Sequence, residues 1–449
     1  MTCPDCARLQ EENTRLQEEN TRLQEENLKL QQENAELSRR LAAYENPHTP
    51  PSRKLIYPRP RCRTDAPRFP GRPRGHVGST RPHLLPDVVV EPPRKERCTR
   101  CGSPLGEPTR VGHRIVEEIS NPAPRQVLDY LEYGYECTEC GAYTSSRHPD
   151  CPPGGRLGKN ALVQATLLKF QDRLPHRKVS EALERTYGLT VAPATVLDIT
   201  RRVAGWLWPE YTRILRRIRA SPVVYVDETS VRVDGRRYWT WAFTAQTDTL
   251  IVIRKSRGKK VLKEVLGKDY PGVIVCDGWS SYPGFTDLIQ RCWAHLLREA
   301  DCLAEQVEEA RPLSLALHRL YDRVKVWAVD KPPPDVAALL AGEGKKAMTA
   351  LAGMPWMTEK ARRFTGKVMN GLDSWFTFLA VPGCEPTNNR AERALREHVV
   401  QRKIMGCFRN GKGTWIYETV MTVLSTWKQQ GRDLPQALGE TLTQEWNKS

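Results

Sequence analysis

Three acidic residues stand where carboxylates can do metal chemistry. Asp227 directly follows an apolar run at 223–226, of the kind that forms a buried strand, and Asp277 directly follows a similar run at 273–276. Taken singly, either aspartate could be a strand-end cap or a turn residue. A third acid, Glu392, lies much later in the chain, in a segment with the pattern of an amphipathic helix.

Glu392 is the acid of that segment that best fits a metal ligand. The helix is expected to open after good N-terminal capping residues, and Glu392, Leu395 and Val399 are spaced to share its apolar face. A carboxylate on an apolar face is unfavourable unless it is paired or binds a metal ion. Asn388 lies one turn earlier and could bond the same site or the substrate. Two other acids fit this face less well: Glu385 and Glu397.

Three such carboxylates would suit hard divalent cations. Mg²⁺ prefers oxygen ligands and retains several waters, so a few acids suffice, and Mn²⁺ is the alternative ion. Two such ions can clamp the attacking and leaving oxygens of a phosphodiester. We therefore expect Asp227, Asp277 and Glu392 to bind Mg²⁺ and to support cleavage of a phosphodiester.

The elements around the two aspartates predict an RNase H-like core. Four strands are expected: residues 223–226 continued by 229–233, then 238–243, 249–253 and 273–276. A helix at 259–266 precedes the last of them, and a helix-like stretch at 313–351 predicts an insertion before Glu392. In this arrangement the first and fourth strands of the core are neighbours, so their aspartates converge.

Four cysteines have the spacing of a structural Zn²⁺ site: Cys98, Cys101, Cys137 and Cys140. They form two Cys-x-x-Cys pairs, each followed by glycine, and such knuckles place four thiolates around one tetrahedral zinc. A reducing compartment keeps cysteines as thiols or metal ligands, which suits the odd total of 13. With strand-like stretches at 114–119 and 126–136, the pattern predicts a zinc ribbon, either purely structural or in contact with DNA.

Two further cysteine pairings carry less information. Cys292 and His295 have a spacing that puts both side chains on one helix face, but two ligands without partners are weak evidence for a metal site. A packing or substrate-orienting role is favoured over a zinc-dependent hydrolase centred on His295. Cys3 and Cys6 indicate an irregular terminus more than a metal site between two chains.

The first 45 residues repeat a heptad pattern. Leucine recurs at every seventh position, and asparagine fills most of the a positions: Leu9, Leu16, Leu23, Leu30 and Leu37 with Asn13, Asn20, Asn27 and Asn34. Asparagine at a favours a parallel two-stranded coil in which amides bond across the axis. We therefore expect a homodimer or higher assembly, the alternative being a lone polar helix.

The next segments indicate a nucleic-acid partner. Residues 46–96 are basic and carry twelve prolines, which predicts an extended tether that contacts phosphates or serves only as a spacer. The whole chain has 69 Lys and Arg against 53 Asp and Glu, a net charge of +16 that favours a polyanionic partner. Helices expected at 162–170, 179–187 and 194–207 resemble a helix-turn-helix, although any small helical bundle has the same pattern.

Several multi-residue motifs follow one another along the chain: Asp227-Glu228-Thr229, Arg236-Arg237-Tyr238-Trp239, Cys276-Asp277-Gly278-Trp279 with Tyr282, Cys292-Trp293-Ala294-His295-Leu296 with Arg298, Asn388-Asn389 with Ala391-Glu392-Arg393-Ala394-Leu395-Arg396, and Arg402-Lys403. In these motifs the chain resembles the insertion sequence 66 (TnpC-type) family of DDE transposases over nearly its whole length. The resemblance implies a DDE triad at Asp227, Asp277 and Glu392. Glu397-His398 departs from it, since proline is expected there. The candidate substrate-binding residues are Asn388, Arg393, Arg396, Arg402, Lys403 and His295.

The sequence thus predicts a multidomain α+β protein. The expected parts are a leucine-zipper coiled coil (1–45), a basic proline-rich linker (46–96), a zinc-binding ribbon (97–150), a helical, helix-turn-helix-like DNA-binding domain (156–220), an RNase H-like α/β catalytic domain (221–400) with a helical insertion at about 300–380, and a C-terminal helical segment (401–449).

The expected function is that of a DNA transposase that binds element ends, cleaves them and joins them to target DNA. The alternative is a catalytically inactive, transposase-derived DNA-binding protein. Accessory proteins encoded by the same element are further candidate partners. The sequence offers no apolar run of ~18 residues and no signal-peptide pattern, so we expect no membrane partner and a cytoplasmic location at the prokaryotic nucleoid.

Overall fold

A computed structural model describes residues 4–44, 127–128, 130, 133–136, 140, 143–146, 148–154, 156–278, 281–330 and 332–448. The chain divides into two compact units, Met1–Glu117 and Glu118–Ser449. In the first unit the described part is one helix, α1 (Pro4–Tyr44), whose side chains are exposed at 12–35. The predicted helix is present, while its pairing into a coiled coil stays a prediction. The predicted linker at 46–96 lies outside the described residues.

The second unit holds all the described strands: β1 (Tyr133–Glu136), β2 (Tyr143–Ser146), β3 (Val223–Val233), β4 (Arg236–Thr244), β5 (Thr249–Arg254), β6 (Val273–Cys276) and β7 (Ile289–Arg291). Its helices are α2 (Lys159–Phe170), α3 (His176–Tyr187), α4 (Pro193–Ala220), α5 (Lys259–Leu266), α6 (Trp293–Gln306), α7 (Arg311–Asp330), α8 (Pro334–Ala352), α9 (Glu359–Asn370), α10 (Thr377–Ala380), α11 (Asn389–Met405), α12 (Gly411–Gln429) and α13 (Leu434–Trp446), with short 3-10 helices at Glu308–Ala310 and Leu372–Ser374.

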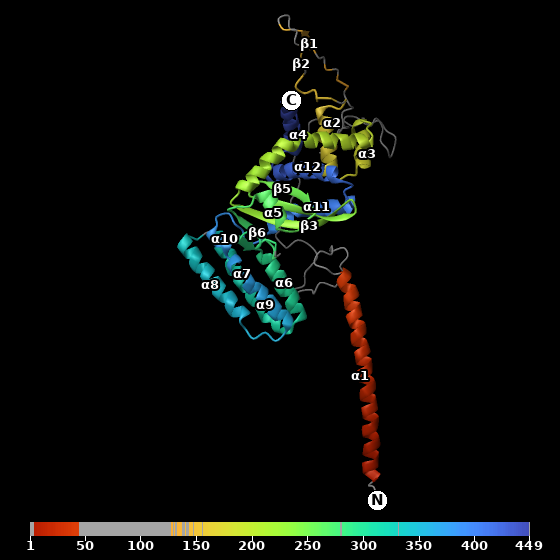
Figure 1. Ribbon diagram of the computed structural model, residues 1–449, viewed down its shortest axis with the longest axis vertical. Coiled ribbons are helices and arrows are strands. Elements are labelled where there is room, and N and C mark those ends of the chain that lie inside the picture. Colours follow the sequence, from red (N-terminus) through yellow and green to blue (C-terminus); the bar gives the residue numbers. More distant parts are fainter. Residues whose placement is uncertain are drawn as a thin grey trace, which may run out of the picture. The chain divides into compact units, whose positions relative to one another are not determined.

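The core is a five-stranded mixed sheet in the order β5-β4-β3-β6-β7 (Figure 1). β3, β4 and β5 are antiparallel, whereas β6 runs parallel to β3 and β7 runs parallel to β6. This confirms that the strands expected to be first and fourth are neighbours. As expected, residues 229–233 continue the strand that begins at 223, because the residues between them keep their pairing with β4.

Helices cover both faces of the sheet. On one face, α11 packs Leu395 against Ala242 and Ile251, and Ala391 against Tyr225. On the other face, the apolar side chains of α4 and α5 join the same core as the remaining strand residues. The sheet is therefore the buried, sandwiched kind that its continuous Val/Ile runs predict.

Helix α12 closes the free edge of the sheet. The backbone N–H groups of β5 donate to α12 side chains in three successive pairs: Thr249 to Thr426 (3.0 Å), Ile251 to Thr422 (2.9 Å) and Ile253 to Glu418 (3.0 Å). Four residues along a helix span nearly the same length as two residues along a strand, so the three donor–acceptor pairs remain aligned. This edge is thereby protected from pairing with another chain.

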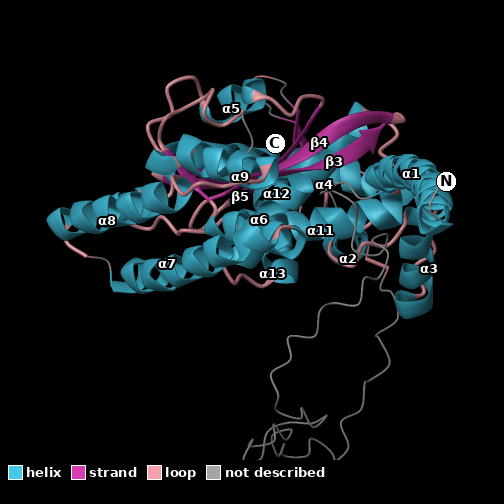
Figure 2. Ribbon diagram, turned by 90° about the horizontal axis from the view of Figure 1, so that it is seen from below, coloured by secondary structure: helices cyan, strands magenta, loops and turns pink. Residues whose placement is uncertain are grey.

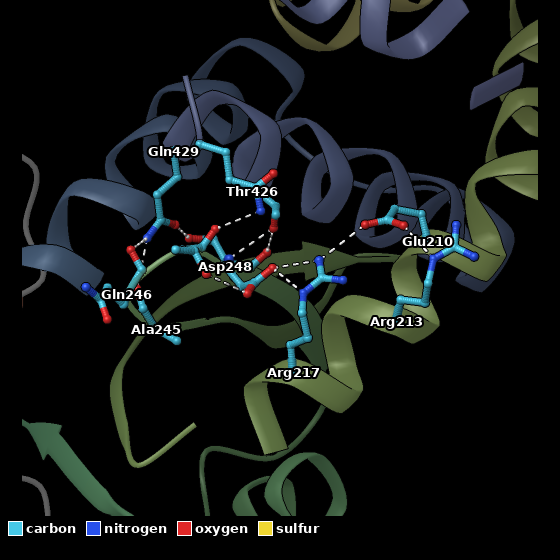
Figure 3. A network of polar contacts seen from close by, with 11 residues as sticks. Glu210, Arg213, Arg217, Ala245, Gln246, Asp248, Thr426 and Gln429 are labelled. Carbon is cyan, nitrogen blue, oxygen red and sulfur yellow. Dashed lines mark hydrogen bonds and ion pairs between the residues drawn. The ribbon is translucent and has the colours of Figure 1, made fainter. Parts of the chain in front are cut away.

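A polar network fixes the turn between β4 and β5 to the helices around it. Arg217 of α4 donates to Asp248 in the turn, and Gln429 of α12 donates to the carbonyl of Ala245 (Figure 3). Helices α12 and α13 are thus packed onto α2, α4 and β5, and α11 continues through the boundary expected at residue 400. Residues 401–449 are structurally continuous with the core.

The helices between β7 and α11 have a hydrophobic core of their own, which includes Trp293, Val324, Met348, Phe364 and Phe376. The stretch expected as one helical region at 313–351 is two helices, α7 and α8, which project beyond the sheet (Figure 2). Prolines at 332–334 separate them, because proline lacks a backbone donor and ordinarily begins a helix rather than continuing one.

The first helices of the second unit lie close to their expected positions, and Gly188 ends α3 with a positive φ of 63°. The third helix was expected to end at residue 207, but α4 continues to Ala220 through Pro209 because Ile214 and Ile218 extend its buried face. Arg202 of α4 donates to the carbonyls of residues 153 and 154. DNA recognition by this part stays a prediction.

Strands β1 and β2 form an antiparallel hairpin at the second cysteine pair. Cys140 is exposed in its turn, whereas Cys98, Cys101 and Cys137 lie outside the described residues. The strand predicted at 126–136 is described only in part, and the one at 114–119 is not described. Among the described helices, none combines the length and apolar character of a membrane span.

Candidate active site

The ends of two neighbouring strands bring the aspartates together. β3 and β6 are parallel, with Val223 opposite Val273 and Tyr225 opposite Val275. Two residues further along this register, Asp227 comes level with Asp277. Both side chains are half-buried. The convergence expected from the strand order is therefore present in the geometry.

A third strand end adds a thiol and an imidazole to the same edge. β7 is parallel to β6, and the backbone N–H of Cys292 donates to the carbonyl of Cys276 over 2.9 Å, just beyond the ladder. α6 begins at the next residue, so His295 lies in its first turn. Because carboxyl ends of parallel strands share one edge, Cys292 and His295 lie beside the strand that bears Asp277.

The segment before α11 is fastened to the end of β3, and this brings Glu392 to the site. The hydroxyl of Tyr225 donates to the carbonyl of Gly383 (3.2 Å) and accepts from the N–H of Glu385 (2.9 Å). The side-chain amide of the fully buried Asn388 donates to the carbonyl of Val226 over 2.8 Å. Glu392 follows in the first turn of α11.

The buried face of α11 differs slightly from the expected one. Its buried residues are Ala391, Leu395, His398 and Gln401, whereas Glu392 and Val399 flank this stripe and are half-buried. Both sets of residues fit the helix period, and packing of Ala391 and Leu395 against the sheet selects the buried one. The Glu392 side chain is 32% exposed, so it can reach a site at the rim.

The two alternative acids are occupied elsewhere. Glu385 pairs with Arg390 at 2.5 Å, and Glu397 pairs with Arg173. Neither ion pair involves the aspartates at the strand ends. Their positions favour Glu392 as the third acid.

Negative charge accumulates around Asp227. Burial raises the pKa of Asp227 well above its ordinary value, and the charges of Glu228, Asp277 and Glu392 act in the same direction, while the N–H of Glu228 opposes them. Carboxylates arranged in this way are stabilised in their ionised form by a divalent cation. The carboxylate oxygens of Asp227, Asp277 and Glu392 are the type of donor that a hard ion such as Mg²⁺ or Mn²⁺ prefers.

Cationic groups of the helical insertion border the acids. Arg298 donates to Glu392 Oε1 over 3.0 Å, and His295 Nδ1 lies 3.5 Å from the same oxygen. Burial and the charge of Arg298 lower the pKa of His295, against the effect of Glu392. Lys367 lies beside Gly278, where an added Cβ would come within 3.1 Å of Lys367 Cε. Sequence reasoning gave no role to Arg298 or Lys367.

A buried ion pair supports the other face of β3. Glu228 is 5% exposed and accepts hydrogen bonds from Arg257 (2.7 Å) and from the Tyr282 hydroxyl (2.6 Å). The pKa of Glu228 is raised by burial, and these two bonds oppose the shift. The motif residues Glu228 and Tyr282 thus contact each other, which their spacing in the sequence did not predict.

The remaining candidates for substrate binding differ in availability. Arg393, Arg396 and Lys403 are exposed on α11. Arg402, in contrast, is half-buried and donates to Thr229 Oγ1 (2.8 Å) and to Ser230, so it ties α11 to β3. Its engagement with the sheet makes a structural role the better interpretation.

Among the described residues, one group of three side chains holds its ligand atoms close enough together to bind a metal ion. One ligand atom each from Cys292, His295 and Glu392 lies within 4.8 Å of the other two. The Cys292-His295 pair, which lacked a third ligand in the sequence, thus gains one from α11.

The family model described as "Transposase IS66 family" matches residues 154–415, which is more than half of the chain. The match spans the helices before the sheet, the sheet itself, the insertion and α11.

Three relatives come from Sinorhizobium fredii (strain NBRC 101917 / NGR234). Uncharacterized protein y4hP is 22% identical over 385 residues, covering 76% of this chain and 68% of that protein. Uncharacterized protein y4jD is 28% identical over 247 residues (50% and 46%), and uncharacterized protein y4qI is 25% identical over 326 residues (63% and 58%). The chain thus spans between about half and two thirds of these relatives, whose names carry no activity.

Proposed function

We propose that this chain, which belongs to the transposase IS66 family, nicks the DNA ends of its mobile element and joins the freed 3'-hydroxyls to target DNA. Family membership implies transposition, with DNA as the partner. The proposal goes further in naming the reaction and the residues. The observation that carries it is the register of β3 and β6, which sets Asp227 beside Asp277.

Asp227, Asp277 and Glu392 are the proposed ligands of Mg²⁺ or Mn²⁺. The proposal is supported by their oxygen donors and by the raised pKa of Asp227, which burial and then the neighbouring carboxylates cause. When bound there, such ions would neutralise the charge that develops on the attacking and leaving oxygens of the phosphodiester. The tether of Asn388 to Val226 holds Glu392 near the strand ends.

Basic residues around the acids are proposed to hold the DNA backbone. Arg298 and Lys367 belong to the helical insertion and border Glu392 and Gly278, respectively. Arg393, Arg396 and Lys403 extend an exposed basic surface along α11. Phosphate contacts of this kind position DNA without reading its sequence.

The segments that precede the sheet are proposed to assemble the protein on DNA. A coiled coil through α1 would give a homodimer or higher assembly, and a zinc ribbon at Cys98, Cys101, Cys137 and Cys140 would hold structural Zn²⁺. Helices α2 to α4 are the proposed DNA-binding domain. Accessory proteins of the same element remain candidate partners, and the nucleoid is the proposed place of action.

The experiment is a nicking assay with purified full-length protein, Mg²⁺ and a DNA end from its own element. We expect strand nicking that EDTA abolishes. DNA binding without metal-dependent nicking would instead support the alternative, a catalytically inactive DNA-binding derivative of a transposase.

A further inference from the structure

A thiol, an imidazole and a carboxylate converge at the edge of the sheet. Cys292 ends the ladder beyond β7, His295 lies one turn along α6, and Glu392 comes from the first turn of α11. One ligand atom from each lies within 4.8 Å of the other two. The cluster therefore joins elements that are far apart in the sequence.

Its geometry is close to that of a zinc site with an open position. Zn–S, Zn–N and Zn–O bonds of about 2.0 to 2.3 Å place neighbouring ligand atoms roughly 3.5 Å apart in a tetrahedron. His295 Nδ1 and Glu392 Oε1 are 3.5 Å apart, and the widest gap in the cluster must close by roughly 1 Å. His295 and Glu392 side chains are 37% and 32% exposed, so they have room to adjust.

Two independent observations favour a bound metal ion in this cluster. His295 Nδ1 is buried and has no hydrogen-bond partner among the described residues, although it faces Glu392. The N–H of Asn388 donates to Cys292 Sγ over 3.1 Å, a contact that stabilises a thiolate and orients it as second-shell groups do around metals.

The ligand types determine which metal would bind. Sulfur and imidazole nitrogen are soft or borderline ligands that select Zn²⁺ and its neighbours over Mg²⁺, which requires oxygen. Among the charged groups near the cluster, Arg298 donates to Glu392 and would have to release it, which its 60% exposed side chain allows. Lys367 is paired with Glu299.

We propose that Cys292, His295 and Glu392 form a second metal site that binds Zn²⁺ or a similar soft divalent ion, with solvent as the fourth ligand. Glu392 belongs to both this site and the proposed Mg²⁺ site. Zn²⁺ therefore withdraws Glu392 from the triad and inhibits Mg²⁺-dependent nicking, a consequence that rests on the proposed function.

The direct test is titration of the full-length protein with Co²⁺, which reports thiolate ligation through a charge-transfer band. We expect the wild type to bind one more tight Co²⁺ per chain than Cys292→Ser, and His295→Gln to bind it at least about 10- to 100-fold more weakly. Cys302→Ser, which changes an exposed cysteine of the same helix, should match the wild type.

Equal Co²⁺ stoichiometry and equal charge-transfer intensity in the wild type and His295→Gln would overturn the proposal. This comparison is decisive even if Cys292→Ser fails to fold, because His295 is only partly buried. A loss of the band in Cys302→Ser but not in Cys292→Ser would also overturn it.

A nicking assay then separates this proposal from the proposed function. Zn²⁺ added to reactions that contain Mg²⁺ should remove a larger fraction of the nicking activity of the wild type than of Cys292→Ser. Each fraction is calculated from the activity of the same protein with Mg²⁺ alone. A protein that gains the extra Co²⁺ but never nicks DNA contradicts the proposed function alone. A protein that nicks DNA but binds no extra Co²⁺ contradicts the second site alone.

Discussion

The side-chain amide of Asn388 donates to the carbonyl of Val226 over 2.8 Å, so the residue that precedes α11 is bonded to the residue that precedes Asp227. Glu392 lies one turn beyond Asn388. This single bond connects the segment that carries the third acid to the strand that carries the first.

Asn388→Ala should therefore weaken both the fold and the site. Loss of a fully buried hydrogen bond is expected to cost about 1 to 3 kcal/mol of stability, measured by denaturant unfolding. Mg²⁺-dependent nicking should fall under conditions in which the variant is still folded. The neighbouring Asn389→Ala, at an exposed position, is the control. Equal behaviour of the two variants would refute the tether.

Arg257→Ala should be strongly destabilising because it removes the cationic partner of the buried Glu228 carboxylate. The Glu228 side chain is 1% exposed and pairs with Arg257 at 2.7 Å. Removing one partner of a buried ion pair typically costs about 3 to 5 kcal/mol. Adding Glu228→Gln to Arg257→Ala should recover part of this loss in a double-mutant cycle.

The exposed pair Arg363–Glu359 provides the matched comparison. Arg363→Ala should change the free energy of unfolding by less than about 1 kcal/mol. Similar losses in the two arginine variants would show that the Glu228 pair is not buried in solution.

Two glycines of α8 should respond oppositely to alanine. A Cβ at Gly344 would come within 2.4 Å of the Phe376 ring, whereas a Cβ at Gly342 meets nothing within 4 Å. Gly344→Ala is thus expected to destabilise by about 1 to 3 kcal/mol through overpacking. Gly342→Ala should stabilise by up to about 1 kcal/mol through helix propensity. Thermal unfolding of both variants tests whether the insertion packs as described.

His398 should make the protein less stable in mild acid. Burial lowers its pKa from 6.5 to about 4, and its Nδ1 lies 2.7 Å from the Tyr417 hydroxyl. Between these two values the unfolded chain binds a proton that the folded chain does not. Stability is therefore complete above about pH 6.5, falls as the pH drops towards 4, and loses roughly 3 kcal/mol from this residue.

Denaturant unfolding at a series of pH values measures this effect. His398→Gln should flatten the dependence between pH 6.5 and 4. An unaltered pH dependence in His398→Gln would contradict the assignment.

Much of the core could be predicted from apolar runs alone. The strand ending before Asp277 and the helix at 259–266 have the expected bounds, because short Val/Ile runs and amphipathic spacing are strong local signals. The length of α4 could not be predicted, since Pro209 lies within it and proline ordinarily ends a helix. Its continuation depends on burial against the sheet, which is a tertiary effect.

The side-chain contacts around the three acids were harder to predict from the sequence. The positions of Asp227 and Asp277 follow from strand order, which is a property of the fold class. The contact of Arg298 with Glu392 depends on how the insertion packs, and no periodicity encodes it. The edge bonds from β5 to Thr422 and Thr426 were equally hidden, because threonines four apart are common in helices.

The most direct test of the central claim is a nicking assay that compares acids within one protein. Asp227→Asn, Asp277→Asn and Glu392→Gln are expected to lose Mg²⁺-dependent nicking by more than about 100-fold while still binding DNA. Glu385→Gln and Glu397→Gln, at acids paired with Arg390 and Arg173, should retain it within a few-fold. A Glu392→Gln variant that nicks DNA like the wild type would contradict the account.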